Sequence, residues 1–283
     1  MNKRLEYYAI RTALATIAVT PLFVARWYVG LLDRFIPKWR HIALVNLRLS
    51  GMPLGCADKV FDSLARLAHV FARLPRINRG NVRRWIRYEG LEHFQEAKRR
   101  GKGVLFATGH LGCWELSHYA HALMTEPMSV VVRPLDNPYL DEFVERRRSG
   151  SGNKILGKKD LLRDVLKALH ANQAVGILID QNTATEEGAF VDFFRVPASS
   201  NTGFVRLAHK TGAAVIPGFA VWREAERKFV LKFYPILEMT GDLVADTQAV
   251  QHAVERAVRE YPDQWLWIHR RWKARPPGGD PIY

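Results

Sequence analysis

A histidine and a glutamate with four residues between them lie in the segment GHLGCWE, residues 109–115. On one regular helix His110 and Glu115 would be about 140° away from a shared face. Their side chains can therefore meet only if His110 lies in a turn and Glu115 in the first turns of a following helix. Gly109 and Gly112 give the backbone the freedom for such a turn. The carboxylate would then hold one imidazole nitrogen, fix the tautomer and make the other nitrogen a better general base.

The alternative, which these residues alone leave open, is that His110 only caps the helix or completes the turn. The pair directly follows the apolar run GVLFAT, residues 103–108, which predicts a buried strand. Because α/β sheets bind ligands at the carboxyl ends of their parallel strands, a site is expected at this position.

Short apolar runs bounded by turn signals alternate with helical patterns after residue 89. The runs predict buried strands at 103–108, 128–133, 174–180, 213–222 and 227–236. The patterns predict helices over roughly 111–124, 137–149, 160–171, 201–212 and 246–261. Strands that alternate with helices predict an α/β fold with a mixed, largely parallel sheet flanked by helices.

The chain of 283 residues is strongly basic, with 42 Lys and Arg against 28 Asp and Glu, a formal charge of +14. Residues 1–100 hold 19 of the basic and 7 of the acidic residues, so +12 of this charge belongs to the first third. Such an excess implies an anionic partner, which is a membrane surface, a nucleic acid or an acidic protein. A hydrophobic content of 48% excludes disorder for most of the chain.

A mostly apolar stretch of 21 residues, Thr12–Leu32, has Arg26 as its only formal charge. About 20 apolar residues can cross a bilayer, but Pro21 would kink such a helix. Basic residues flank both ends, which a helix half-inserted in the membrane surface explains better than a span. We expect a membrane-anchoring hydrophobic helix over 1–37, a basic helical segment over 38–88 and an α/β catalytic domain over 89–283. A buried core helix is the alternative for this stretch.

Neither a metal site nor a disulfide framework is expected. Cys56 and Cys113 are the only cysteines, and Cys113, His118 and His121 lack the spacing of known metal-ligand motifs. We therefore expect no metal and no cofactor. The tryptophan and basic residues of 265–275 could stack on nucleic acid. Beside a hydrophobic amino terminus they favour a membrane-interface or structural role, so no nucleic-acid partner is expected.

Several segments, in order along most of the chain, resemble the lipid A biosynthesis acyltransferases, the lauroyl/myristoyl transferase family of the His-x4-Asp/Glu acyltransferases. They are ALVNLRLSG (43–51), GHLGCWE (109–115), VVRPLDNPYLDEFVERRRSGSGNKIL (131–156), GILIDQN (176–182), AFVDFFRVPASSNTGFVRLAHKTGAAVIPGF (189–219) and WLWIHRRWKARPP (265–277). The resemblance implies a fold like that of the glycerolipid acyltransferases. Cys113 stands where the family commonly has Asn, and Arg195 stands where it usually has Gly. Arg195 thus adds a charge to a loop expected near the acceptor or acyl groove.

The resemblance implies transfer of a fatty acyl chain from an acyl carrier protein thioester to a hydroxyl of a lipid A precursor. The enzyme would act on the cytoplasmic face of the inner membrane. His110 would be the general base, and Glu115 would orient its imidazole. Arg147, and similarly Arg133, are candidates to stabilise the oxyanion or to bind an acceptor phosphate. A solvated helix face is the alternative for each arginine.

Further candidates follow from the same resemblance. Asp180 and Gln181 end the strand 174–180 and are substrate-binding candidates, the alternative being a helix cap or a loop hydrogen bond. Phe193 and Phe194 are candidates to line an acyl groove, and plain core packing explains them equally well. Arg83, Arg84 and Arg87 are candidate contacts for the acidic carrier protein or for a phosphorylated acceptor, and a solvated basic face is the alternative.

Two other functions remain open from the sequence. One is the same chemistry on a phospholipid, glycolipid or aminolipid acceptor, with acyl-CoA as a second candidate donor. The other is a membrane-associated lipid-binding protein without catalytic activity.

Overall fold

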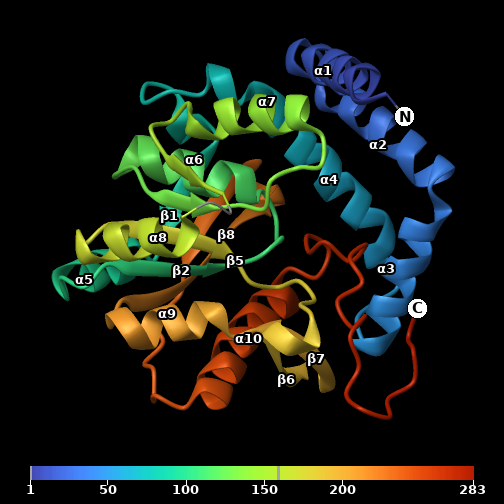
Figure 1. Ribbon diagram of the computed structural model, residues 1–283. Helices are drawn as coiled ribbons and strands as arrows, with labels where there is room; N and C mark the ends of the chain where they lie inside the picture. Colours follow the sequence, from blue (N-terminus) through green and yellow to red (C-terminus); the bar gives the residue numbers. More distant parts are fainter. Residues whose placement is uncertain (1, 158–159) are drawn as a thin grey trace.

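The computed structural model describes residues 2–157 and 160–283, in which helices surround a central sheet (Figure 1). The strands are β1 (Ile86–Glu89), β2 (Val104–Thr108), β3 (Ser129–Val131), β4 (Lys154–Leu156), β5 (Ala174–Leu178), β6 (Gly188–Phe193), β7 (Val196–Asn201), β8 (Ala214–Arg223) and β9 (Lys228–Phe233). The α-helices are α1 (Lys3–Val19), α2 (Leu22–Phe35), α3 (Pro37–Leu49), α4 (Cys56–Arg73), α5 (Leu91–Arg99), α6 (Trp114–Met124), α7 (Pro138–Ser149), α8 (Leu161–His170), α9 (Gly203–Thr211) and α10 (Leu243–Glu260).

The central sheet of the described residues has the strand order β1-β9-β8-β2-β5-β3-β4. Its neighbouring strands are parallel except for β8 and β9, which form an antiparallel pair. The strands β6 and β7 make a separate antiparallel hairpin. The prediction of a mixed, largely parallel sheet flanked by helices is therefore confirmed. β1 begins at Ile86, so the sheet starts slightly before residue 89, where the catalytic domain was expected to begin.

Strand residues alternate between the two faces of this sheet. One face, called here the α6 face, presents Phe106 of β2, Gly176 of β5 and Gly218 of β8, and it packs with α5 and α6. The opposite face packs with α8, α9 and α10 and with three buried tryptophans of the C-terminal segment. Figure 1 shows α6 and α7 on one side of the strands and α9 and α10 on the other.

The N-terminal helices α1–α4 run along one flank of the molecule (Figure 1). The apolar stretch 12–32 does not form one continuous helix, because α1 ends at Val19 and α2 begins after Pro21. Across the described chain, we find no helix with both the length and the apolar character needed to cross a bilayer. The inner sides of α1 and α2 pack on α4.

The outer sides of α1 and α2 carry many of the exposed large hydrophobic side chains of the described chain. They are Leu5, Tyr8, Ile10, Val19, Phe23, Trp27, Leu32 and Phe35. Monomeric soluble proteins rarely expose apolar residues in such density on one element pair. This surface, called here the α1–α2 surface, is therefore a candidate contact face for a partner or a membrane.

Candidate active site

His110 and Asp180 meet at the carboxyl edge of the sheet. His110 lies two residues after the end of β2, and Asp180 lies two residues after the end of β5. The parallel pairing of these strands puts Thr108 beside Leu178, so the two side chains leave the sheet at the same level. Nδ1 of His110 donates to Oδ1 of Asp180 over 2.8 Å. A Cβ at Gly109 would lie 2.9 Å from the Asp180 carboxyl carbon, so the glycine permits this close approach.

Asp180 is an almost fully buried carboxylate with several hydrogen-bond donors. Its Oδ2 accepts from the backbone N–H of His110 and from Nε1 of Trp265, each over 2.7 Å. Burial alone would raise the pKa of Asp180, but the charge and hydrogen bond of His110, together with the Trp265 donor, hold the pKa at about 2. Asp180 is thus ionised at neutral pH and can only accept hydrogen bonds.

The ionised carboxylate determines the tautomer of His110. Since Asp180 can only accept, Nδ1 carries the proton and Nε2 keeps its lone pair. Nε2 lies 3.4 Å from the side-chain amide nitrogen of Gln181, which is exposed at the rim of the site. The ring of Trp114 meets the imidazole edge to face with the centroids 5.0 Å apart. His110 therefore has the tautomer and the exposure of a general base.

The expected contact between Glu115 and His110 is wrong. Glu115 does lie in the first turn of α6, but its carboxylate faces Arg148 of α7. Arg148 donates from Nε and Nη2 to both carboxylate oxygens, over 2.9 and 2.6 Å. Nε2 of His118 lies 3.5 Å from the same carboxylate. Burial would raise the pKa of Glu115, but Arg148 and His118 lower it to about 2. Asp180 fills the position next to the imidazole instead.

An apolar pocket adjoins this site on the α6 face of the sheet. Its empty volume, mouth included, is about 580 Å³, and Thr108 and Trp114 beside His110 belong to its lining. A Cβ at Gly176 would lie 2.8 Å from Cε of Met128, so a side chain there would displace Met128, which lines the pocket. The Glu115–Arg148 pair also lines the wall. A histidine base beside an apolar pocket suits chemistry on one end of a hydrocarbon chain.

A sequence profile of the bacterial lipid A biosynthesis acyltransferases matches residues 7–274. The chain belongs to this family. It is 30% identical over 207 residues to the lipid A biosynthesis palmitoleoyltransferase of Escherichia coli K12, a match covering 71% of this chain and 66% of that protein. It is 31% identical over 201 residues to the lipid A biosynthesis lauroyltransferase of the same organism, covering 70% and 65%. The matches thus span slightly less than two thirds of these two relatives.

A relative with a different acceptor in its name is just as similar. The phosphatidylinositol mannoside acyltransferase of Mycobacterium tuberculosis H37Rv is 30% identical over 232 residues, covering 78% of this chain and 71% of that protein. Sequence identity alone therefore does not identify the acceptor lipid of this acyltransferase.

The arginine candidates of this acyltransferase family member differ in their surroundings. Arg147 donates to the backbone carbonyls of Phe71 and Ala72 over 3.3 and 3.1 Å, and it stacks on the ring of Phe143. It holds the end of α4, so it was wrong to place Arg147 at the oxyanion or at a phosphate. Arg133 is exposed beyond β3. Arg148, the next residue after Arg147, is the arginine that reaches the pocket, and only helix packing distinguishes the two.

The phenylalanine pair belongs to the core of the fold. Phe193 is fully buried against Trp265 and Trp272, and Phe194 packs on Trp267. The expectation that the pair lines an acyl groove is therefore wrong, because the hydrophobic effect draws both rings into the aromatic cluster.

Arg195 lies in the turn between β6 and β7, where Phe194 and Arg195 have φ of 57° and 62°. Both residues have the positive φ of a type I′ turn, in which glycine is favoured. The usual glycine of the family thus suits this backbone, and the arginine of this chain projects from an exposed turn.

Proposed function

We propose that the protein transfers a fatty acyl chain from an acyl carrier protein thioester to a hydroxyl of a lipid A precursor. The observation that carries this proposal is the ionised Asp180 on Nδ1 of His110, which keeps the lone pair on Nε2, beside an apolar pocket. Family membership supports acyl transfer as the reaction type. The names of the E. coli relatives support lipid A biosynthesis as the pathway.

The proposed reaction needs one base that later acts as an acid. Nε2 of His110 takes the proton of the acceptor hydroxyl while its oxygen attacks the thioester carbonyl carbon. Asp180 stabilises the imidazolium formed in this step, as a buried carboxylate does beside a catalytic histidine. The tetrahedral intermediate then expels the thiolate, which recovers the proton from Nε2. The products are an ester and a free thiol, and His110 returns to its starting tautomer.

The apolar pocket is the proposed site of the acyl chain. Its lining includes Phe106, Met128 and Phe233, which offer a hydrocarbon chain an apolar environment. Thr108 and Trp114 lie at the end next to His110, where the thioester carbonyl would sit. In this assignment Glu115 acts through Arg148, as a positioning residue that fixes the pocket wall, and not on the imidazole.

We further propose that the protein binds the cytoplasmic face of the inner membrane through the α1–α2 surface. Phe23, Trp27 and Phe35 are 65%, 59% and 75% exposed there. Aromatic and aliphatic side chains on an amphipathic helix insert into the interfacial region of a bilayer. The excess of +12 in residues 1–100 would add attraction to anionic lipids. A surface-bound helix pair accounts for basic residues on both sides of the apolar stretch.

A second acceptor class has support from one observation, the 30% identity to a phosphatidylinositol mannoside acyltransferase. The experiment that decides offers detergent-solubilised protein a radiolabelled acyl carrier protein thioester. A lipid A precursor and a phosphatidylinositol mannoside are tested in parallel, and acyl-CoA replaces the carrier thioester in a second series. Transfer only to the lipid A precursor supports the proposal, and transfer only to the other lipid overturns the acceptor while keeping the chemistry.

The variants of this experiment separate an enzyme from a binding protein. His110→Ala removes the proposed base, and His252→Ala removes an exposed histidine of α10 as a matched control. We expect His110→Ala to abolish transfer and His252→Ala to retain it. Folded protein that transfers to no acceptor from either donor would instead support a lipid-binding protein. A loss of only a few fold in His110→Ala would contradict the role of His110 as the base.

A further inference from the structure

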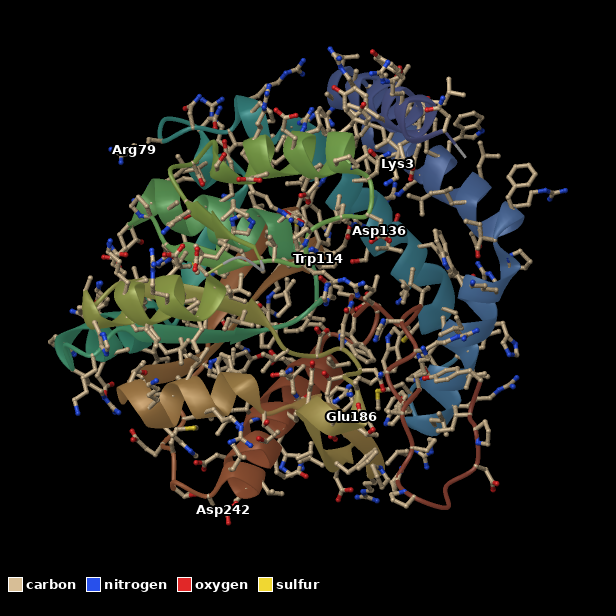
Figure 2. The ribbon with its side chains drawn as sticks, in the orientation of Figure 1. Lys3, Arg79, Trp114, Asp136, Glu186 and Asp242 are labelled. Carbon is tan, nitrogen blue, oxygen red and sulfur yellow. The ribbon has the colours of Figure 1, made fainter. Side chains whose placement is uncertain are left out.

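His121 brings a polar ring into the apolar pocket, far from the proposed base. Trp114 and His121 both belong to α6, and both line the pocket. Trp114, near the middle of the view in Figure 2, packs on the ring of His110. A helix rises about 1.5 Å per residue, so His121 lies about 10 Å farther along α6 than Trp114. The two side chains therefore mark two depths of the same pocket.

The imidazole of His121 is neutral and almost completely buried. The residue is 1% exposed. Aromatic rings meet the imidazole edge to face with centroids between 4.6 and 6.0 Å away, and they belong to Tyr88, Phe94, Phe106 and Phe233. Burial, with a smaller contribution from the charge of Lys98, lowers the pKa of His121 to about 3. A neutral imidazole has one N–H donor and one acceptor nitrogen, so each nitrogen needs a partner in this dry environment.

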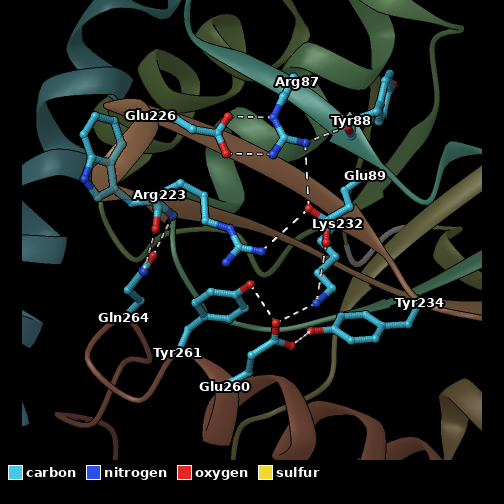
Figure 3. Close-up of polar contacts among 11 residues, drawn as sticks. Arg87, Tyr88, Glu89, Arg223, Glu226, Lys232, Tyr234, Glu260, Tyr261 and Gln264 are labelled. Carbon is cyan, nitrogen blue, oxygen red and sulfur yellow. Dashed lines mark hydrogen bonds and ion pairs between the residues drawn. The ribbon is translucent and has the colours of Figure 1, made fainter.

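One nitrogen of His121 has a partner and the other does not. Nδ1 lies 2.7 Å from the hydroxyl of Tyr88, which also lies 2.9 Å from Oγ1 of Thr125. Tyr88 belongs to β1 and lies outside the pocket lining, and Figure 3 shows its ring pointing away from the paired Arg87 and Glu226. Nε2, on the other side of the imidazole, is buried and has no hydrogen-bond partner among residues 2–157 and 160–283. Such a nitrogen is unfavourable unless a bound molecule supplies the missing hydrogen bond.

The other histidine of the pocket wall has partners for both nitrogens. Nδ1 of His118 lies 3.0 Å from the side-chain nitrogen of Asn153, and its Nε2 lies 3.5 Å from the carboxylate of Glu115. An unpaired nitrogen is therefore particular to His121 in this pair. Packing does not explain His121 either, because a phenylalanine would suit the same aromatic surroundings without burying a polar atom. The unpaired Nε2 suits a ligand that carries a polar group at this depth of the pocket.

We propose that the pocket takes an acyl chain with a hydroxyl group part-way along its length, and that Nε2 of His121 binds this hydroxyl. A hydroxyl both donates and accepts, so it satisfies Nε2 in either tautomer of the imidazole, whereas a carbonyl oxygen only accepts. With the thioester carbonyl beside Trp114, the hydroxyl lies about 10 Å deeper, well beyond the β-carbon of the chain. This inference rests on the proposed acyl transfer and specifies the donor as a thioester of a mid-chain hydroxy fatty acid.

The test compares acyl carrier protein thioesters of one chain length that differ only in the hydroxyl. One chain is unsubstituted, one has a hydroxyl near its middle, and one has a hydroxyl on the β-carbon. We measure kcat/KM for each thioester with a lipid A precursor as the acceptor. His121→Phe keeps the aromatic packing and removes both nitrogens. Tyr88→Phe is the matched control, because it removes the partner of Nδ1 and leaves Nε2 in place. Thermal unfolding verifies that each variant is folded.

The wild type should prefer the mid-chain hydroxyl to the unsubstituted chain by about tenfold in kcat/KM. The β-hydroxyl should bring no gain, because it lies too close to the thioester to reach His121. His121→Phe should reverse the preference, since the hydroxyl would then be buried without a partner, and Tyr88→Phe should keep it. Equal values for the two chains in the wild type would assign a buried water to Nε2 and overturn the proposal. The same preference in the wild type and His121→Phe would also overturn it.

A binding measurement tests the pocket separately from the transfer reaction. If the wild type transfers no chain to the lipid A precursor, the proposed function fails, and binding of the free fatty acids in neutral detergent micelles then tests His121 directly. Isotope-labelled histidine reports on Nε2 by NMR, and the signal of His121 is identified by its absence in His121→Phe. Tighter binding of the mid-chain hydroxy acid, with a shift of this signal that the unsubstituted acid does not cause, would support the proposal. Equal affinity for the two acids without such a shift would overturn it.

Discussion

Replacing Asp180 with asparagine changes the charge and the acceptor set of this side chain while keeping its shape. In the wild type, Oδ2 accepts two N–H groups and Oδ1 accepts Nδ1–H of His110. Asparagine has a single acceptor oxygen. With that oxygen at the Oδ2 position, the donors from the His110 backbone and Trp265 stay satisfied, and the amide NH2 faces Nδ1. Nδ1 must then accept, so the imidazole proton moves to Nε2 and the base is lost.

The opposite amide orientation is less favourable in this site. It would set two buried N–H donors against the NH2 group, at about 1–3 kcal/mol for each unsatisfied donor. The first orientation therefore dominates. Serine proteases with the corresponding Asp→Asn change lose about 10⁴ in kcat through the wrong tautomer. We expect Asp180→Asn to lower kcat by about 10³- to 10⁴-fold in a protein that remains folded.

The assay measures kcat for acyl transfer together with the thermal unfolding midpoint. Trp265→Phe is the matched control, because it removes one donor to Oδ2 and leaves the Nδ1 hydrogen bond in place. We expect the control to lose less than about tenfold in kcat. If Asp180→Asn keeps kcat within tenfold of the wild type while His110→Ala is inactive, Asp180 does not determine the tautomer and the reasoning is refuted.

Three other predictions concern Glu115, Gly176 and the α1–α2 surface. Because the pKa of Glu115 is lowered from 4.5 to about 2, its contribution to stability is present above pH 4.5 and is lost as the pH falls toward 2. The unfolding free energy of Glu115→Gln, measured in urea at a series of pH values, should lack about 3 kcal/mol of this pH dependence. An equal change of unfolding free energy with pH in the wild type and the variant would contradict the ion pair of Glu115 with Arg148. Gly176→Ala should shift the preferred acyl chain to shorter lengths by about one or two methylenes, since its Cβ would lie 2.8 Å from Met128; competing thioesters measure the shift, and Met128→Ala should restore longer chains. Replacing Phe23 and Trp27 with serine should lower partition into anionic vesicles at least about tenfold, because each loses an exposed ring, and unchanged cosedimentation would argue against membrane contact through this surface.

The strands that carry the site were predictable from the sequence because each is an apolar run between turn signals. The runs 103–108 and 174–180 contain β2 and β5, and the alternation with helices indicated their parallel pairing. The strands β1 and β4 of the central sheet were missed, and so were both strands of the hairpin, β6 and β7. β4 has only three residues, and β1 carries Arg87 and Glu89 at the exposed edge of the sheet, where charged side chains replace the apolar signal (Figure 3).

The partner of His110 was not predictable from the spacing within one motif. Asp180 is 70 residues away, and its contact depends on the register of β2 with β5. The sequence did contain a signal, because Asp180 follows its strand at the same offset as His110 follows β2. The contact of Glu115 with Arg148 has no such signal, since it depends on how α6 packs on α7.

The segment between His110 and Glu115 explains why two residues so close in sequence take different partners. Gly112 has a φ of 66°, and a Cβ there would lie 2.1 Å from the carbonyl oxygen of Ala220. This close approach to β8 turns the chain so that His110 stays at the sheet edge while Glu115 enters α6 and faces α7. Each carboxylate then contacts one basic side chain. Asp180 contacts His110, the proposed base, and Glu115 contacts Arg148 in the pocket wall. The spacing of the motif therefore links the proposed base to the wall of the apolar pocket, because one turn positions both residues.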